Sequence, residues 1–300
     1  MSPRTACLSS RAETAPRFPQ FCSDVSRENH EPLLGTASRI DHWLLVEYRG
    51  LWGPEAIRSA GFSDQAKAAL RAQTRAREHT RLLFIRRPDR RRRADLRAYA
   101  ATSVEGEETL RCCTFEAYDD LRELDLATAG DEVDEPLFLV CTHGKHDPCC
   151  ARKGRPLFEA LEEQLEAETV WQSTHVGGDR FAGNVVCLPH GVYYGRVGRE
   201  EAVDVLDAYL TGVLSLVHYR GRSCHPFPAQ AAERSIRDAT GFAAIDDLRF
   251  EGERNGVFGF VDRTGARHER RVVVELGTED YLTCGATQMR RPRRFVVTAT

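Results

Sequence analysis

No run of apolar residues in this chain approaches about 18, the length that a membrane-spanning helix requires. The first residues also lack the continuous apolar stretch of a secretory signal. Residues 1–20 are rich in Ser, Arg, Ala and Pro, a composition typical of a disordered lead-in. We therefore expect a cytoplasmic protein with no membrane partner.

Several common catalytic signatures are missing as well. The chain has no Gly-x-Ser-x-Gly and no Gly-x-x-x-x-Gly-Lys, which argues against a serine hydrolase and against a P-loop nucleotide site. It also has no Cys-x-x-Cys, the spacing of a thioredoxin-type redox dithiol.

Charge of one sign is not in excess, since the net charge is −3, with 41% apolar and 29% charged residues. Two arginine runs stand out, six in residues 86–93 and four in residues 290–294. No aromatic residues are interleaved with them, so we interpret them as solvated loops and expect no nucleic-acid partner.

Cysteine, by contrast, is plentiful, with ten residues in 300. In a reducing compartment such a number indicates metal ligation or redox chemistry more than a disulfide framework. A chain of this length can also bury the cores of two domains.

Apolar patterns predict the same order of elements twice: strand, helix, strand, a pair of strands, then a helix. The first copy has strands at 43–48, 81–86, 96–104 and 109–115 and helices at 63–79 and 116–126. The second has strands at 136–140, 169–174, 184–188 and 192–197 and helices at 155–168 and 199–217. This order predicts an α/β fold, a thioredoxin-like mixed sheet with flanking helices, in two tandem copies.

A small α+β segment follows, with a helix at 229–240 and several strands, to which we assign no chemistry. The predicted domains are a lead-in, two thioredoxin-like domains and the C-terminal region, at 1–20, 21–130, 131–220 and 221–300.

The chemistry concentrates in two loops of the second copy. Cys141 follows a strand, and Gly144 and Pro148 let the loop curl back so that Cys150 comes near it. The positive end of the helix expected from Arg155 would favour thiolates here.

The second loop carries His175, then Gly177 and Gly178, then Asp179. Its glycines allow close backbone approach. A cysteine pair from one loop and a histidine-containing pair from the other would make a closed four-ligand site for an iron–sulfur cluster or zinc.

These motifs, Cys-x-His-Gly-x-x-Asp-x-x-Cys from residue 141, His-Val-Gly-Gly-x-x-x-Ala-Gly-Asn from residue 175 and Tyr-Tyr-Gly from residue 193, resemble the sucrase/ferredoxin-like family. The resemblance extends over most of residues 20–240. Three shorter segments resemble bacterial members of the family: 22–26, 31–36 and 222–226. No residue supports sugar chemistry.

The resemblance implies that 131–220 is a thioredoxin-like ferredoxin domain with a 2Fe–2S cluster on two cysteines and two histidines. The matching positions are Cys141, Cys150, His175 and Asp179. Asp179 stands where the family has a second histidine, and carboxylate is a hard ligand for cluster iron. Cys187 is the first substitute as fourth ligand, with Cys149 and His190 behind it; alternatively this branch has lost the cluster.

The remaining candidates have simpler interpretations. Cys112 and Cys113 are neighbours on a strand and should face opposite sides as core thiols. Cys22, Cys224 and Cys284 are scattered, so we expect no second cluster. His143 and His146 tune the first site by hydrogen bonds or stabilise its turn, and Cys149 is a spare thiol.

The leading hypothesis is therefore an electron carrier or redox sensor with a redox protein as its partner, rather than an enzyme. One alternative is a thiol–disulfide oxidoreductase that uses Cys141 and Cys150. The other is a structural or interaction module that binds zinc or no metal.

Overall fold

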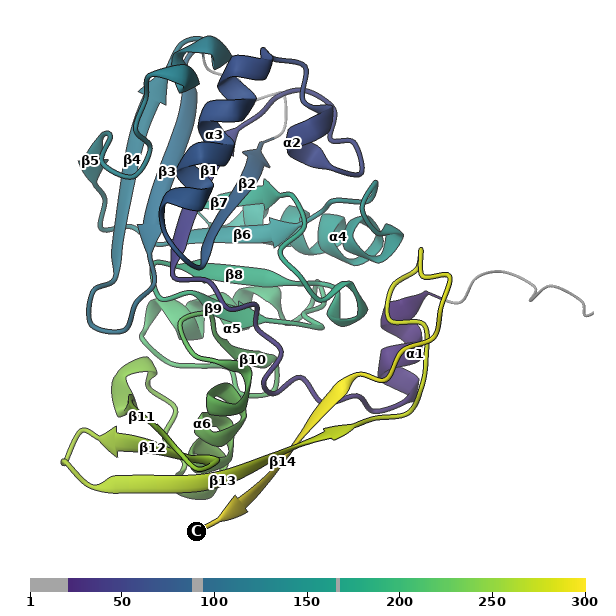
Figure 1. The fold of residues 1–300 in the computed structure, drawn as a ribbon, viewed down its shortest axis with the longest axis vertical. Helices are drawn as coiled ribbons and strands as arrows, with labels where there is room; N and C mark the ends of the chain where they lie inside the picture. Colours follow the sequence, from purple (N-terminus) through teal and green to yellow (C-terminus); the bar gives the residue numbers. More distant parts are fainter. Residues whose placement is uncertain (1–20, 88–93, 166–167) are drawn as a thin grey trace, which may run out of the picture.

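The computed structural model describes residues 21–87, 94–165 and 168–300, which Figure 1 shows as a ribbon. Ten strands form one curled mixed sheet, and the C-terminal part forms a separate four-stranded sheet. The expected disordered lead-in and residues 88–93 of the first arginine run lie outside the described residues.

The first half of the large sheet has two parallel strands joined by a helix. Its main elements are β1 (His42–Glu47), α3 (Asp64–Ala76), β2 (Thr80–Arg86), β3 (Leu96–Thr102) and β4 (Thr109–Phe115). Strands β1 and β2 are parallel, β3 is antiparallel to β1, and β4 is antiparallel to β3. Three short elements accompany them: α2 (Ala56–Ser59), η2 (Tyr118–Arg122) and β5 (Asp131–Glu132), which pairs with β4.

The second half repeats this connectivity. Its elements are β6 (Leu137–Cys141), α4 (Pro148–Gln164), β7 (Val170–Ser173), η3 (Asp179–Phe181), β8 (Val185–Leu188), β9 (Val192–Tyr194) and α5 (Ala202–Leu210). Strands β6 and β7 are parallel, while β8 and β9 continue antiparallel. The two halves meet where β2 pairs antiparallel with β7, so they share one sheet. The predicted mixed α/β sheet with flanking helices is confirmed.

Alternation along each strand divides the core into layers. In β6, Leu139 and Cys141 pack with Trp43 on one face, whereas Phe138 and Val140 pack beneath α4 and α5 on the other. Successive strand residues point to opposite faces, and both faces of these central strands are covered. The side chain of Cys141 is therefore fixed on the same face as Trp43.

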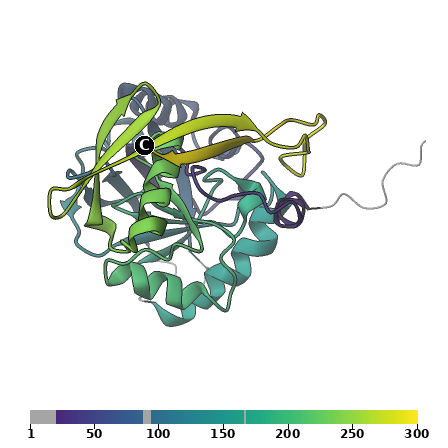
Figure 2. The same ribbon diagram turned by 90° about the horizontal axis from the view of Figure 1, so that it is seen from below.

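The C-terminal part packs a helix on an antiparallel sheet. Its elements are β10 (Tyr219–Arg222), which extends the large sheet beside β9, α6 (Phe227–Thr240), η4 (Ile245–Asp247), β11 (Leu248–Arg254), β12 (Val257–Asp262), β13 (Arg267–Leu276) and β14 (Arg293–Ala299). The loop at 277–292, between β13 and β14, reaches back to α1 (Cys22–Glu28) in both views (Figures 1 and 2).

The start of α4 differs from the sequence prediction. The helix begins at Pro148, not near Arg155, because the Asp147 side chain accepts a hydrogen bond from the Cys149 amide at 2.8 Å and caps it. Proline is well suited to the first helical position. Pro156, which we took as the start signal, lies inside the helix on its exposed side. Cys149 and Cys150 thus occupy the first turn of a helix rather than a loop.

Two other helices are shorter than expected. The segment 116–126 forms only the 3-10 helix η2, and 199–217 is helical only through α5. Gly212, with a φ of 78°, follows the end of α5 in a left-handed conformation that stops the helix. Among the described residues, no helix combines the length and apolarity needed to cross a membrane.

Candidate metal centre

Cys141, Cys150 and His175 come together at the carboxyl ends of the central strands β6 and β7, although they belong to three separate segments. Cys141 ends β6 and is paired with Ser173 at the end of the parallel strand β7. The residues that follow β7, among them His175, therefore leave the sheet beside Cys141. The first turn of α4 brings in Cys150. One ligand atom from each of the three lies within 4.8 Å of the other two.

Backbone approach makes this convergence possible. A side chain at Gly154 would place its Cβ 2.0 Å from the Cys141 carbonyl oxygen, so only glycine lets α4 lie this close to the end of β6. Arg220 fixes the other side, because its guanidinium donates to the Gly177 carbonyl at 3.0 Å and to Asn184 at 2.8 Å. Asn184 in turn donates to the Gly178 carbonyl at 2.9 Å.

The two thiols differ in electrostatic character. Hydrogen bonds from the Cys150 thiol and, more weakly, from His175 hold the pKa of Cys141 well below its usual range despite complete burial. The same bond with Cys141, together with burial, raises the pKa of Cys150. A thiolate at Cys141 is therefore the favoured charge state, which is the form that binds metal.

His175 is held on both sides of its ring. Its Nδ1 lies 3.7 Å from the Cys150 sulfur, and its Nε2 lies 3.1 Å from the Asp179 carboxylate. Asp179 thus contacts the imidazole and is not grouped with the thiols. The Asp179 carboxylate therefore fixes the orientation of the imidazole ring.

Two more histidines form a layer over the site. The His143 Nδ1 accepts the His175 backbone amide at 3.3 Å, and its Nε2 lies 2.8 Å from the Gly53 carbonyl, so Nε2 carries the proton. Burial lowers the pKa of His143 and keeps the ring neutral. The exposed His146 ring stacks on His175 with centroids 3.9 Å apart, and its ligand atom lies within 4.8 Å of those of His175 and Asp179. Sequence reasoning gave His146 no ligand role.

The substitute ligands suggested by the sequence lie elsewhere. Cys187 packs with Phe138 in the core on the opposite face of the sheet, where burial raises its pKa. His190 Nδ1 lies 2.7 Å from the Tyr209 hydroxyl. Cys149 points into a different group. We name Cys141, Cys150, His175 and Asp179 the Cys141 site.

That different group corrects three expectations. Cys149 is not a spare thiol, and Cys22 and Cys284 are not scattered, because the three cysteines lie together with Asp147. Through Cys284, the C-terminal region therefore contributes a potential metal ligand. We name this second group of potential ligands the Cys22 site. As expected, Cys112 and Cys113 pack in different core clusters on opposite faces.

One comparison with known proteins covers the residues of the Cys141 site. A sequence model of the family described as sucrase/ferredoxin-like matches residues 33–221. "Altered inheritance of mitochondria protein 32" of Meyerozyma guilliermondii is 35% identical over 100 residues, which are 30% of this chain and 36% of that protein. The protein of the same name from Debaryomyces hansenii is 28% identical over 90 residues, 27% of this chain and 33% of that protein.

The matches therefore span about a third of these yeast relatives, and nothing here supports the bacterial branch. The solved thioredoxin-like [2Fe-2S] ferredoxin from Aquifex aeolicus is 20% identical, with a TM-score of 0.27, over 30% of this chain and 100% of that one. A TM-score this low does not establish a shared fold, so the fold described above is based on the chain's own topology.

Proposed function

Because the chain belongs to the sucrase/ferredoxin-like family, we propose that it is an iron–sulfur protein that binds a 2Fe–2S cluster at the Cys141 site and carries electrons or senses redox state. The observation that carries the proposal is the convergence of two cysteines and a histidine from three segments at the carboxyl ends of β6 and β7. A 2Fe–2S cluster takes thiolate ligands and accepts imidazole in place of thiolate on one iron.

The donor set fits this group in three of four positions. Cys141 and Cys150 would supply thiolate ligands, and His175 would supply an imidazole. We assign the fourth position to Asp179, whose carboxylate oxygen lies 3.1 Å from the His175 Nε2. Two such ligands on one tetrahedral metal lie about 3.3 Å apart, given bonds of about 2.0 Å. His146, stacked on His175, is the competing fourth ligand.

When bound, the cluster supplies one-electron chemistry. The protein's own residues set its surroundings: Cys141 and Cys150 are buried on the inner side, while His146 is exposed on the outer side. Imidazole ligation makes a cluster potential higher and sensitive to protonation. A redox protein that docks over the exposed histidine edge would be the electron donor or acceptor. A reducing compartment, for which we propose the cytoplasm, keeps the thiols available.

Zinc is a second candidate, and the compactness of the site favours it. The Cys150 sulfur and the His175 Nδ1 lie 3.7 Å apart, a separation suited to ligands of a single tetrahedral ion. Were zinc the bound metal, the site would be structural and would have no redox role.

A thiol–disulfide oxidoreductase is the third candidate. It is favoured by the proximity of the Cys141 and Cys150 sulfurs, within 4.8 Å, and by the opposite shifts of their pKa values. The low-pKa thiol would attack and the other would resolve the mixed disulfide. Alkylation of both thiols before and after mild oxidation tests this function, because a cycling pair loses two alkylation sites on oxidation.

The deciding experiment is metal analysis of protein prepared anaerobically. We expect two irons and two sulfides per chain at the Cys141 site and a visible absorption that Cys141→Ser, Cys150→Ser and His175→Ala abolish. The controls are Cys113→Ser and His218→Ala, which lie outside the site; His218 is half-buried like His175, and Cys113 is half-buried whereas Cys141 and Cys150 are fully buried. Zinc that these three site variants lose, without iron or sulfide, would support the structural alternative instead.

A further inference from the structure

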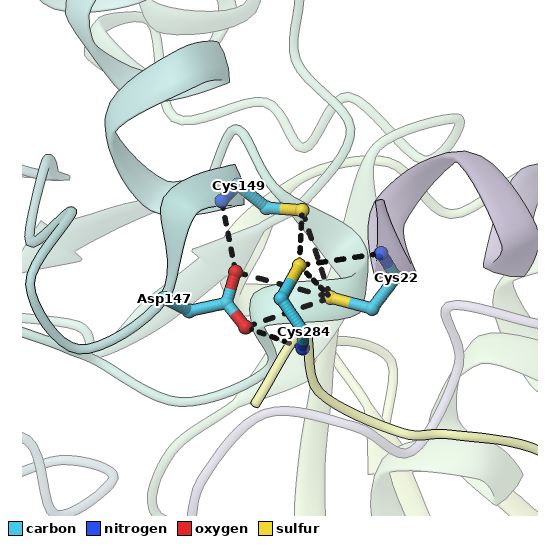
Figure 3. A group of neighbouring side chains, drawn as sticks. All are labelled: Cys22, Asp147, Cys149 and Cys284. Carbon is cyan, nitrogen blue, oxygen red and sulfur yellow. Dashed lines mark hydrogen bonds between the residues drawn. The ribbon is translucent and has the colours of Figure 1, made fainter. Parts of the chain in front are cut away.

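A second group of ligand atoms lies outside the Cys141 site. The sulfurs of Cys22, Cys149 and Cys284 form a triangle with sides of 3.6, 3.3 and 3.6 Å, as Figure 3 shows. They come from α1, the first turn of α4 and the 277–292 loop, and Cys22 and Cys284 are 262 residues apart in the chain. Chance contact of two thiols is common, but three from remote segments around one point need an explanation.

Asp147 completes the group from the fourth side. Its Oδ1 accepts the Cys149 amide and its Oδ2 accepts the Cys284 amide, both at 2.8 Å. The same carboxylate lies 3.8 Å from the Cys22 sulfur. One side chain thus orients the backbone of two of the thiol residues and faces the third, and ligating carboxylates are commonly held by such hydrogen bonds.

The dimensions of the triangle decide what it can hold. Thiolates bound to one tetrahedral ion at about 2.3 Å lie about 3.8 Å apart, close to the observed separations. A four-iron cluster would need its cysteines much farther apart. The donors are three soft sulfurs and one oxygen, a combination suited to zinc and unsuited to calcium or magnesium.

Burial also fits a closed structural site. Cys149 is fully buried, Cys22 and Asp147 are nearly so, and Cys284 is half-buried. Ala182 and Phe21 line the group.

We propose that Cys22, Cys149 and Cys284, with Asp147 as the fourth donor, form a structural zinc site distinct from the Cys141 site. Zinc there ties α1 and the 277–292 loop to the start of α4. Because Cys149 and Cys150 share the first turn of that helix, the ion also fixes the segment that presents Cys150 to the other site. This inference does not depend on the proposed function.

A cobalt titration tests the site with the neighbouring thiols removed. The full chain carrying Cys141→Ser and Cys150→Ser is stripped of metal anaerobically and titrated with Co²⁺, whose thiolate charge-transfer and tetrahedral bands report cysteine ligation. We expect the bands to saturate at one equivalent and to disappear when zinc is added. Adding Cys22→Ser and Cys284→Ser should abolish them, whereas adding Cys113→Ser should not.

Asp147→Asn tests Asp147 both as the fourth donor and as the acceptor for the Cys284 amide, because asparagine is an equally good helix cap but has a single oxygen. We expect its Co²⁺ and Zn²⁺ affinity to fall roughly 10- to 100-fold with the helix content unchanged. Bands that survive the loss of Cys22 and Cys284 would overturn the proposal, and so would their absence from a background variant that keeps the native circular dichroism.

A measurement on the unsubstituted chain keeps the test valid if the multiple variants fail to fold. Zinc should protect the half-buried Cys284 from alkylation, detected by mass spectrometry of the modified peptide, and should leave Cys113 unaffected. Equal alkylation of Cys284 with and without an excess of zinc that fills both sites would also overturn the proposal.

Discussion

At the scale of single residues, Cys149 and Cys150 show how one step along a helix separates two chemistries. Consecutive helical residues are rotated by about 100° around the axis. Cys150 therefore faces Cys141 and His175, while Cys149 faces Cys22 and Cys284. Had the segment been a loop, as the sequence suggested, the neighbouring thiols would have been interchangeable. The capping by Asp147 makes them distinct.

Asp179→His gives a prediction at this scale. The substitution replaces a hard carboxylate at the fourth position with the histidine that the family pattern has, and imidazole is the better donor to cluster iron. We expect slower loss of iron and sulfide in air, and a cluster potential more positive than that of the unsubstituted chain. Timed iron release and potentiometry measure both. If His146 is the fourth ligand, Asp179→His changes neither quantity and His146→Ala accelerates the loss.

At the scale of elements, the strands were predictable, whereas the start of α4 and the end of α5 were not. Short runs of apolar residues placed β1, β2 and β6 within one or two residues, because both faces of these strands are buried. The start of α4 was missed because Pro156 outweighed the signal of Asp147 followed by proline. Both are valid start signals, and only the hydrogen bond to the Cys149 amide distinguishes them.

The attachment of α6 gives a second prediction. Glu233 and Arg237 pair at 2.8 Å with neither side chain exposed, and Glu233 also accepts the Tyr219 hydroxyl of β10 at 3.0 Å. Glu233→Gln leaves the Arg237 charge buried without its partner, so we expect a loss of about 3–5 kcal/mol in unfolding free energy. Urea denaturation measures it.

The matched control is Glu163→Gln, whose pair with Arg199 is more than half exposed on both sides. Solvent screens such a pair, so about 0–1 kcal/mol should be lost. Equal losses for the two variants would show that the buried pair does not anchor α6.

The third prediction concerns pH. Burial alone would lower the pKa of His225, but the Cys224 sulfur and the Glu105 and Glu233 carboxylates outweigh it and raise this pKa well above its usual value. A raised pKa contributes stability that is complete below about 6.5, the unfolded value, and is lost as pH rises through the folded value. We expect unfolding free energy to fall as pH increases above about 6.5, and His225→Gln to flatten that dependence. Urea denaturation at several pH values above about 6.5 gives the slope of unfolding free energy against pH for both chains. Equal slopes for the unsubstituted chain and His225→Gln would contradict the prediction.

At the scale of the whole molecule, the 277–292 loop between β13 and β14 returns to α1, near the start of the described chain (Figures 1 and 2). The sequence indicated two tandem copies, since each has its own pattern of strands and helices. It did not indicate that β2 and β7 join them into one sheet, because an edge strand carries no pattern that names its partner. It also did not indicate the Cys22 site, since no periodicity connects cysteines 262 residues apart.

The fourth prediction belongs to this scale. Chelation of zinc from the loaded chain should release α1 and the 277–292 loop together, because the same ion holds both. Hydrogen exchange should therefore accelerate in residues 22–28 and 277–292 in parallel, while α6 and β12 stay unchanged. Acceleration in only one of the two segments would contradict a zinc ion that holds both α1 and the 277–292 loop.

The most direct test of the central claim is electron paramagnetic resonance of the anaerobically prepared and then reduced chain. We predict the signal of one unpaired electron on a 2Fe–2S cluster, with a nitrogen coupling that His175→Cys removes while the cluster remains. A nitrogen coupling unchanged in His175→Cys would contradict the ligand assignment. A chain that holds no iron and no sulfide, even after reconstitution, would contradict the proposed function itself.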